Sequence, residues 1–435
     1  MWNLLTMKAE IISIGNELLN GDTVNTNAAW LGEFLTGIGF EVVRIHTISD
    51  GHNVIAKTVD TALNESDLVI STGGLGPTHD DMTKKAVADL FGVGYKRDQQ
   101  VLAHVQAMFE KRNIPFSKSN YAQAEIPENG ETLFNKWGTA PGIWFDLEDK
   151  HLAVLPGVPY EMKHLIKEKV APKLREHYGE VGFLYSKYLK TAGVGESILS
   201  DEILGDLSLY LNEEVKLAFL PNLGGVTLRL MARGQDKEAA WSKLKPLHDV
   251  IYEKAAPFIF GEGKHCSISE AVGDLLREQE LRIATAESCT GGLIASSITD
   301  IAGSSDYMKG GIVSYADSVK LYQLGVLSDT LESEGAVSKK VALQMAKGVA
   351  EKLDADIGIS TTGVAGPGGG SEEKPVGTVW IGFYQKEKQY FAVKAFFTKD
   401  RLMNKERSKM VALEMVRRVL KGINTMPYDL KKERA

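Results

Sequence analysis

The stretch Thr285-Ala286-Glu287-Ser288-Cys289-Thr290-Gly291-Gly292 decides how the rest of this sequence is interpreted. Mostly apolar runs at 281–284 and 293–298 flank it, which is typical of a turn between a strand and a helix. In an open α/β sheet, substrates bind beyond the carboxyl ends of strands, where helix N-terminal amides point at anions. Ser288 therefore stands where a nucleophile would be useful, although a serine before such a turn is also a common helix cap.

A serine hydroxyl needs a base to remove its proton, and the last part of the chain holds a single histidine, His265. A Ser-Lys pair is the other known solution, provided that burial or nearby cations keep the amine neutral. Lys320 is the candidate base, because it follows the strand-like segment 310–315, which ends in Tyr315. The alternative is an ordinary solvated lysine.

Two further features would complete a hydrolytic site. Backbone N–H groups around Thr290 and Gly291, or around Ala365 and Gly366 in the Gly-rich loop 361–371, could form an oxyanion hole. Arg401 begins a long predicted helix at about 401–421 and could hold a substrate phosphate, or it could be an ordinary helix-start arginine. The pattern favours acyl transfer to water, which is amide or ester hydrolysis.

Length and composition predict a globular protein of two or three domains. The chain has 435 residues, 43% hydrophobic and 25% charged, and a net charge of −7 without a long basic run, which argues against direct nucleic-acid binding. Two cysteines, Cys266 and Cys289, argue for a reducing compartment. The start lacks the pattern of a signal peptide and no apolar run approaches about 18 residues. We therefore expect a cytoplasmic protein with no membrane partner.

The first part of the chain alternates strand-like and helix-like segments. Buried strands at 9–15, 41–45 and 67–72, with helices between them, predict an α/β fold with a parallel, doubly wound sheet. The third strand leads into the Gly-rich segment 73–83, in which Gly73, Gly74 and Gly76 would let the backbone approach a phosphate. A tight turn capped by Asp80 or Asp81 is the alternative.

Carboxylates near this segment suggest a metal site. Asp80 and Asp81 suit Mg²⁺ or another hard cation, which would bridge a diphosphate and offset its charge. Glu17, Asp22 and Asp50 also follow predicted strands and could lie at the same end of the sheet. Exposed acidic residues are often merely solvated.

The pattern predicts three domains, at 1–175, 182–256 and 264–425. A hairpin is expected at 143–155, and a small α+β unit, read as a spacer or dimerisation module, at 182–256. Segment 257–263 reads as a linker, and the charged tail 428–435 is expected to fray.

Several motifs resemble the CinA (competence/damage-inducible) family. Residues 73–78 with Asp80, Asp81 and Thr83, the segment 135–142 and Leu155-Pro156-Gly157-Val158-Pro159 are similar to the family's N-terminal domain, itself similar to molybdopterin-binding domains. Residues 285–292, 301–305, Tyr315 with Lys320, 335–338 and 366–380 resemble its C-terminal nicotinamide mononucleotide deamidase domain. The middle unit matches by position and KH-like strand order.

The resemblance implies two hydrolases of pyridine nucleotide salvage. The C-terminal domain would convert nicotinamide mononucleotide to nicotinate mononucleotide and ammonia, with Ser288 as nucleophile, Lys320 as base and Tyr315 beside them. Its remaining expected substrate contacts are Thr290, Gly291, Thr362, Gly363, Ala365, Gly366 and Arg401.

The N-terminal domain would be a metal-dependent ADP-ribose pyrophosphatase that releases AMP. Its divalent cation would be held by Asp81, Asp80, Asp50 and Glu17, and no cofactor is expected at the deamidase site. The expected substrate contacts are Gly73, Gly74, Gly76, Thr78, Asn27, Asn135, Pro141 and Pro156. Asn16 departs from the family, which often has a hydroxyl residue there.

Two other functions remain open at this point. The first domain could bind molybdopterin in cofactor assembly, or the protein could be a regulator or scaffold in DNA uptake or repair whose pockets only sense ligands. The resemblance also implies a homodimer, with the middle unit as the expected contact.

Overall fold

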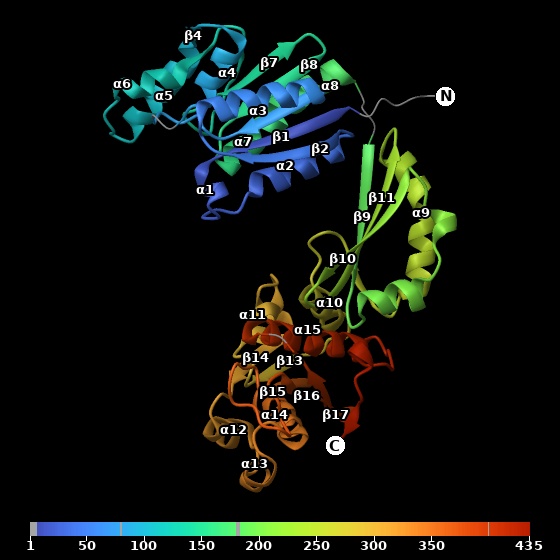
Figure 1. Ribbon diagram of the computed structural model, residues 1–435. Helices are drawn as coiled ribbons and strands as arrows, with labels where there is room; N and C mark the ends of the chain where they lie inside the picture. Colours follow the sequence, from blue (N-terminus) through green and yellow to red (C-terminus); the bar gives the residue numbers. More distant parts are fainter. Residues whose placement is uncertain (1–6, 79–80, 180–182, 399) are drawn as a thin grey trace. The chain divides into compact units, whose positions relative to one another are not determined.

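The computed structural model describes residues 7–78, 81–179, 183–398 and 400–435 (Figure 1). They form two compact units, each considered by itself. The first comprises Met1–Tyr185 with Arg233–Trp241, and the second comprises Ser186–Ala232 with Ser242–Ala435.

The first unit is built on a six-stranded mixed sheet. Its order is β2 (Glu41–Ile48), β1 (Lys8–Ile14), β3 (Leu68–Thr72), β8 (Lys150–Leu155), β7 (Gly142–Leu147) and β6 (Glu131–Leu133). The strands from β2 to β8 are parallel, whereas β7 and β6 are antiparallel to their neighbours. The expectation of a wholly parallel sheet was therefore wrong at this edge. The loop between β7 and β8 is too short for a crossover, and so these strands form the predicted hairpin.

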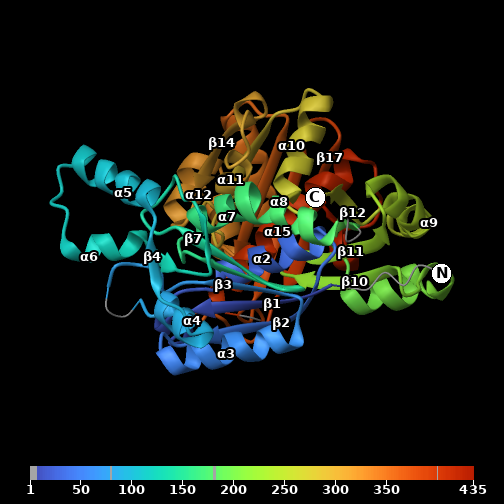
Figure 2. The same cartoon turned by 90° about the horizontal axis from the view of Figure 1, so that it is seen from above.

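Helices cover both faces of this sheet, which confirms the doubly wound α/β architecture (Figures 1 and 2). α2 (Thr26–Gly37) and α7 (Pro159–Leu165) pack on the face that carries Ile11. α3 (His52–Glu65) and α4 (Thr83–Phe91) pack on the opposite face, against Ile12. The remaining elements are α1 (Asn16–Leu19), β4 (Tyr95–Arg97), α5 (Gln99–Lys111), α6 (Lys118–Tyr121), η1 (Ala122–Ala124), β5 (Glu125–Pro127), η2 (Ile166–Val170) and α8 (Ala171–Tyr178).

A small four-stranded sheet follows, and it includes the segment that was expected to be a linker. Its order is β10 (Val215–Asn222), β11 (Gly225–Gly234), β9 (Phe183–Thr191) and β12 (Ile259–Glu262). β12 pairs with β9, because this apolar segment completes an antiparallel edge that β9 offers. The helical elements here are η3 (Ile198–Leu204), η4 (Ser208–Tyr210) and α9 (Lys237–Ala255).

The last sheet has the order β14 (Met308–Val313), β13 (Ile283–Glu287), β15 (Ile357–Gly363), β16 (Thr378–Gln385), β17 (Gln389–Phe396) and β18 (Glu433–Arg434). α10 (Ile268–Glu278), α11 (Leu293–Thr299) and α15 (Arg401–Leu420) cover one face. α12 (Asp317–Leu324) and α14 (Lys339–Lys352) cover the other, and α13 (Ser328–Glu334) lies beside α14. The tail expected to fray instead pairs with β17 through β18.

Within the second unit, a buried charge cluster joins α15 to the small sheet. Glu414, Arg417 and Arg418 are each at most 1% exposed. The Glu414 carboxylate accepts hydrogen bonds of 2.7 Å from both arginines. Arg417 also donates to Pro257 O at 2.6 Å. Each buried charge is thus paired, as burial requires.

Both large sheets begin with the same strand order. In each, the first strand lies between the second and the third, so that the chain reverses direction across the sheet beside the first strand. Ligands of doubly wound sheets bind at such a reversal, beyond the carboxyl ends of the strands. For β1 and β3 this place lies after Ile14 and Thr72, and for β13 and β15 it lies after Glu287 and Gly363.

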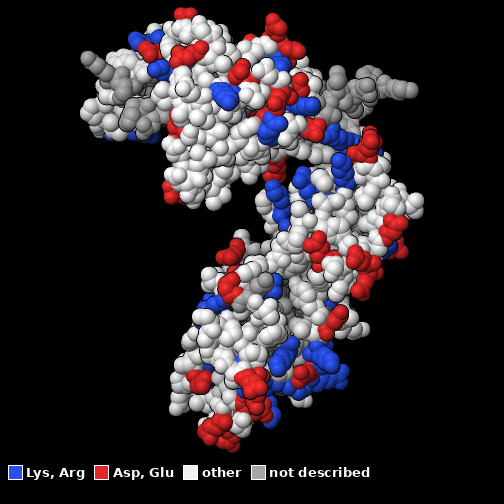
Figure 3. Space-filling model, viewed as in Figure 1, with Lys and Arg blue, Asp and Glu red and all other residues white. Residues whose placement is uncertain are grey.

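In the described residues, no helix is both long and apolar enough to cross a membrane. Basic and acidic side chains are interspersed on the face shown in Figure 3, rather than gathered into one basic stripe.

Candidate functional site

Ser288 lies directly beyond β13, between the ends of its two neighbouring strands. Its N–H donates to Thr361 O of β15 at 2.9 Å, and the N–H of Ser314, just beyond β14, donates to Glu287 O at 2.8 Å. The turn that follows requires glycine, because Gly291 and Gly292 have φ of +66° and +93°. The structure therefore places Ser288 at the reversal point of the sheet.

The N-terminus of α11 is capped by Glu287, not by Ser288. The buried Glu287 carboxylate accepts from the N–H groups of Gly292, Ile294 and Ala295 at 3.0, 3.0 and 2.8 Å. These amides are therefore satisfied by a protein carboxylate and do not face a substrate anion. The capping alternative for Ser288 was wrong, and sequence reasoning missed Glu287, although an acidic residue just before a helix is a usable signal.

Lys320 is buried, with 1% of its surface exposed, but it lies on α12 rather than at a strand end. Its Nζ donates to Asp317 Oδ1 at 3.0 Å and to Tyr315 O at 3.2 Å. Among the described residues, these are the hydrogen bonds of this amine, so that it contacts Asp317 and not the Ser288 hydroxyl. Ser288 and Lys320 nevertheless follow adjacent strands at the same sheet edge.

Arg401 links two of the other predicted residues. Its guanidinium donates to Gly366 O at 2.7 Å and to the Tyr315 hydroxyl at 3.0 Å, and it lies in the first turn of α15. Tyr315 is 63% exposed. The same helix turn contributes Asn404, which donates to Ala365 O at 3.0 Å. α15 thereby fixes the Gly-rich loop beside Tyr315.

The remaining predicted residues surround the end of β15. Thr362 donates from its hydroxyl to Ala336 O at 2.7 Å, and the hydroxyls of Thr290 and Thr361 lie 2.7 Å apart. Gly363 is the last residue of β15. The N–H of Gly291 donates to Ser288 O at 3.2 Å and so closes the turn. To donate to an oxyanion instead, the Gly291 N–H would have to break its hydrogen bond to Ser288 O.

Sequence reasoning missed two charged residues here, Asp317 and Lys405. A Cβ on Gly291 would lie 3.5 Å from Lys405 Nζ, which places a second cation beside the Ser288 turn. Lys405 stands four residues after Arg401, and this helical spacing was the available signal. The acidic residue three positions before Lys320 carried the corresponding signal for Asp317.

Cys289, next to Ser288, is not a candidate nucleophile. It is 6% exposed, and burial raises the pKa of its thiol to about 12. A thiol of this kind stays protonated at neutral pH and reacts slowly. Ser288 therefore remains the candidate nucleophile of this turn.

The first unit has a cavity of about 450 Å³ at its own reversal point. Seven of the predicted residues line it: Gly73, Gly74, Gly76, Pro156, Glu17, Asp50 and Asp81. Gly73 and Gly74 adopt φ of +111° and +66°, and a Cβ on Gly73 would lie 2.2 Å from Ile14 O. The end of β1 and the turn after β3 therefore approach closely only because position 73 is glycine.

Three of the predicted acidic residues line this cavity, and two of them, Asp81 and Asp50, accept hydrogen bonds from other residues of the chain. Asp81 Oδ2 accepts from the Thr78 N–H at 2.9 Å and from its hydroxyl, and Asp50 Oδ2 accepts from Asn16 N at 3.1 Å. Glu17, Asp50 and Asp81 are not among the described groups of three whose ligand atoms lie within 4.8 Å of one another. Asp80 lies outside the described residues.

The other predicted residues support the walls of the cavity. Asn27 donates to Thr72 Oγ1 at 3.2 Å and to Gly157 O at 2.7 Å. Asn135 donates to Ala140 O at 2.9 Å and to Glu161 Oε2 at 2.7 Å, and Pro141 is buried between Ala140 and Gly142. These residues hold the loops in place.

Two lining residues of this cavity were missed, Glu161 and Gln123. Burial raises the pKa of the Glu161 carboxyl, which the Asn135 hydrogen bond partly opposes. Gln123 is 2% exposed, and its buried Oε1 has no hydrogen-bond partner among the described residues. Glu161 stands in the first turn after a strand and was therefore detectable, whereas Gln123, on η1, carried no sequence signal.

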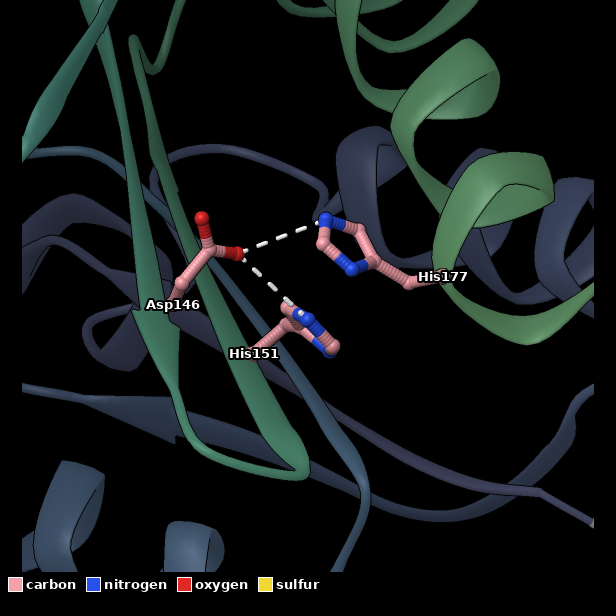
Figure 4. A group of neighbouring side chains, drawn as sticks. All are labelled: Asp146, His151 and His177. Carbon is pink, nitrogen blue, oxygen red and sulfur yellow. Dashed lines mark ion pairs between the residues drawn. The ribbon is translucent and has the colours of Figure 1, made fainter.

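A group of potential metal ligands lies elsewhere in the first unit. Asp146, His151 and His177 bring one ligand atom each within 4.8 Å of the others (Figure 4). None of the three was expected from the sequence.

Comparison with known proteins identifies three consecutive family matches. Residues 10–176 match the probable molybdopterin binding domain, 186–261 the damage-inducible protein CinA KH domain, and 265–420 the CinA C-terminal domain.

Curated relatives align along nearly the whole chain. A CinA-like protein of Salinibacter ruber is 45% identical over 415 residues, which cover 95% of this chain and 100% of that protein. A putative competence-damage inducible protein of Clostridioides difficile is 42% identical, with 87% and 91% covered. The crystal structure of a CinA protein of unknown function from Thermoplasma acidophilum shares 39% identity, covers 38% of this chain and 98% of its own, and has a TM-score of 0.36. The chain therefore belongs to the CinA family, with a molybdopterin-binding-like domain, a KH domain and the CinA C-terminal domain in that order.

Proposed function

We propose that the C-terminal domain hydrolyses the carboxamide of nicotinamide mononucleotide to nicotinate mononucleotide and ammonia. Ser288 Oγ would attack the amide carbon while Lys320 takes its proton, and the same proton would pass to the departing ammonia. Water then attacks the acyl-serine, and the carboxylate product and the free serine result. One observation carries this proposal: Glu287, and not Ser288, caps α11 at the sheet's reversal point, and the buried Lys320 follows the adjacent strand β14.

The cations near the turn support a substrate that carries a phosphate. Arg401 presents a fork of donors beside exposed Tyr315, and Lys405 lies near Gly291. An arginine fork matches phosphate oxygens, and a lysine adds a point charge. We further propose that Arg401 and Lys405 bind the 5′-phosphate of the nucleotide.

The test measures ammonia release from nicotinamide mononucleotide by the full chain. Ser288→Ala should abolish turnover, and Lys320→Met should lower kcat by at least about 100-fold, the usual contribution of a general base. Ser296→Ala and Lys347→Met replace exposed residues and serve as matched controls. Wild-type turnover in both site variants would contradict the Ser-Lys assignment.

For the N-terminal cavity we propose hydrolysis of ADP-ribose to AMP and ribose 5-phosphate with a divalent cation. The donor set fits Mg²⁺, which keeps several waters and needs only one or two carboxylates besides phosphate oxygens. Glu17, Asp50 and Asp81 offer those carboxylates, and a diphosphate would lie in the cavity that Gly73, Gly74 and Gly76 also line. The cation, when bound, would offset charge on the diphosphate.

AMP release from ADP-ribose with added Mg²⁺ tests this second activity. Asp81→Asn and Asp50→Asn should each lower it by at least about tenfold, because each removes charge that would face the cation. Asp60→Asn, on the exposed face of α3, is the control. If the protein binds ADP-ribose but releases no AMP, the cavity is a sensor rather than an enzyme.

The match to the probable molybdopterin binding domain favours one alternative for the same cavity. Displacement of molybdopterin by ADP-ribose, together with AMP release, would support the hydrolase, whereas retention of molybdopterin without hydrolysis would favour cofactor assembly. Salt-dependent binding to DNA without turnover at either site would favour a regulatory role. We also propose a homodimer, which light scattering of the purified full chain tests.

A further inference from the structure

Asp146, His151 and His177 come together at the edge of the first sheet that lies away from the Gly-rich cavity. Asp146 on β7 pairs with His151 near the start of β8, and His177 lies in the last turn of α8. His151 is aligned with Leu68 at the start of β3, whereas the cavity lies beyond Thr72 and Leu155, the strand ends. Figure 4 shows the three side chains converging from the hairpin and the helix. This cluster is therefore separate from the proposed diphosphate site.

The spacing of the ligand atoms matches a tetrahedral metal ion. His151 Nε2 lies 3.4 Å from Asp146 Oδ1, and His177 Nε2 lies 3.5 Å from the same oxygen. Metal–ligand bonds of about 2.0–2.1 Å at tetrahedral angles place two ligands about 3.3–3.4 Å apart. The two histidines are within 4.8 Å of each other, and a small rotation of the exposed His177 side chain would close this third edge.

A hydrogen-bond chain determines which nitrogen of His151 carries the proton. The Tyr178 hydroxyl donates to Asp67 O at 2.7 Å, so that it can only accept from His151 Nδ1, which lies 2.5 Å away. Nδ1 therefore carries the proton, and Nε2 presents a bare lone pair. His151 is 3% exposed, and its buried Nε2 has no hydrogen-bond partner among the described residues.

The lone pair of His151 Nε2 thus faces Asp146 Oδ1 with no proton between the two atoms. A cation bound between them would satisfy both atoms. Trp144 Nε1 donates to Asp146 Oδ1 at 2.6 Å and orients the carboxylate, as outer partners do at metal sites.

We propose that Asp146, His151 and His177 bind one Zn²⁺ ion, with water at the fourth position. Two imidazoles and one carboxylate are ligands that suit zinc better than the oxygen-preferring Mg²⁺. The ion would join the last turn of α8 to the β7–β8 hairpin and so hold this helix against the sheet.

The experiment measures Zn²⁺ binding to untagged, metal-free full-length protein by competition with a chromophoric chelator. Wild type should bind one more Zn²⁺ than His177→Ala or Asp146→Asn. Tyr178→Phe, which removes the hydroxyl that orients His151 and its bond to Asp67 O but no proposed ligand, should weaken binding by about 10- to 100-fold. His177 and Asp146 are exposed, so that their replacement leaves the fold intact, which circular dichroism without zinc checks.

Two controls locate the ion. His52→Ala removes another partly exposed histidine that pairs with an aspartate, Asp89, and should bind Zn²⁺ like wild type. Asp60→Asn, on the exposed face of α3, should also bind like wild type. Co²⁺ in place of Zn²⁺ should give the intense visible bands of a tetrahedral site in wild type and not in His177→Ala. Equal Zn²⁺ stoichiometry and affinity in wild type and His177→Ala, or no Zn²⁺ binding by wild type, would overturn the proposal, whatever the result for ADP-ribose.

Discussion

Lys320 Nζ lies 3.0 Å from Asp317 Oδ1, one helical turn earlier on α12. The amine is buried, whereas the side chain of Asp317 is 61% exposed. The ion pair directs the amine at Asp317. For the proposed deamidation, the amine has to leave Asp317 to reach Ser288, and rotation of the exposed Asp317 side chain would release it.

Asp317→Asn should raise kcat for the proposed deamidation. The amide makes a weaker bond to the Lys320 amine than the carboxylate does, so that the amine leaves position 317 more readily and can turn toward Ser288. Ammonia release at saturating nicotinamide mononucleotide checks this, with Asp329→Asn on the exposed face of α13 as control. An unchanged kcat would mean that the ion pair does not hold Lys320 back, and loss of activity would give Asp317 an essential role of its own.

Arg401→Lys should raise KM for nicotinamide mononucleotide by about tenfold and change kcat less. Lysine cannot reproduce the two simultaneous bonds to Gly366 O and the Tyr315 hydroxyl, nor the forked contact with a phosphate. Steady-state kinetics check this, with the exposed Arg282→Lys as control. An unchanged KM would remove Arg401 from the phosphate site.

Cys289 should resist alkylation in the native protein despite its place beside Ser288. With a thiol pKa of about 12, fewer than about one molecule in ten thousand carries the thiolate near pH 7.5. Iodoacetamide followed by peptide mass mapping should label half-buried Cys266 first, and Cys289 only after denaturation. Rapid labelling of Cys289 with parallel loss of ammonia release would contradict this assignment.

Glu287→Gln should destabilise the C-terminal domain by about 2–3 kcal/mol. The carboxylate satisfies three N–H groups of α11, and an amide offers one acceptor oxygen and brings an NH₂ group toward the others. Urea unfolding followed by circular dichroism measures the change, with the exposed Glu351→Gln as control. A change below about 0.5 kcal/mol would show that water can replace this cap.

The free energy of unfolding of the first unit should increase as the pH rises from about 8 to 10.5, because Lys84 titrates at a lower pH in the folded chain than in the unfolded one. Burial lowers the pKa of Lys84 from 10.5 to about 8, while Glu125 and Asp81 partly oppose the shift. In this window the folded chain has lost the proton that the unfolded chain still binds, so that stability increases with pH, by at most about 3 kcal/mol. Urea titrations at pH 8 and 10 should show this gain in wild type and in Lys85→Met, and a smaller gain in Lys84→Met. Equal gains in all three proteins would contradict the shift.

Local patterns in the sequence determined most of the fold. The buried strands, the amphipathic helices and the hairpin each depend on periodicity and on turn residues that lie within a few positions of one another. The glycines at 73–74 and 291–292 likewise marked both turns correctly, because positive φ is a local backbone requirement. The places of Ser288 and of the Gly73 turn at the sheet edge follow from this.

Tertiary structure alone decided which side chains meet. Segment 259–262 is a strand because β9 offers it an edge, and residues 433–434 pair with β17 for the same reason. The partners of Arg401 depend on how α15 packs against the sheet, and Gln123 reaches the first cavity from a short helix with no motif. The metal-ligand cluster joins Asp146 and His151 to His177, and His177 is brought there only because α8 packs beside the hairpin. Sequence periodicity specifies the buried face of each element, whereas contacts between distant elements depend on packing in three dimensions.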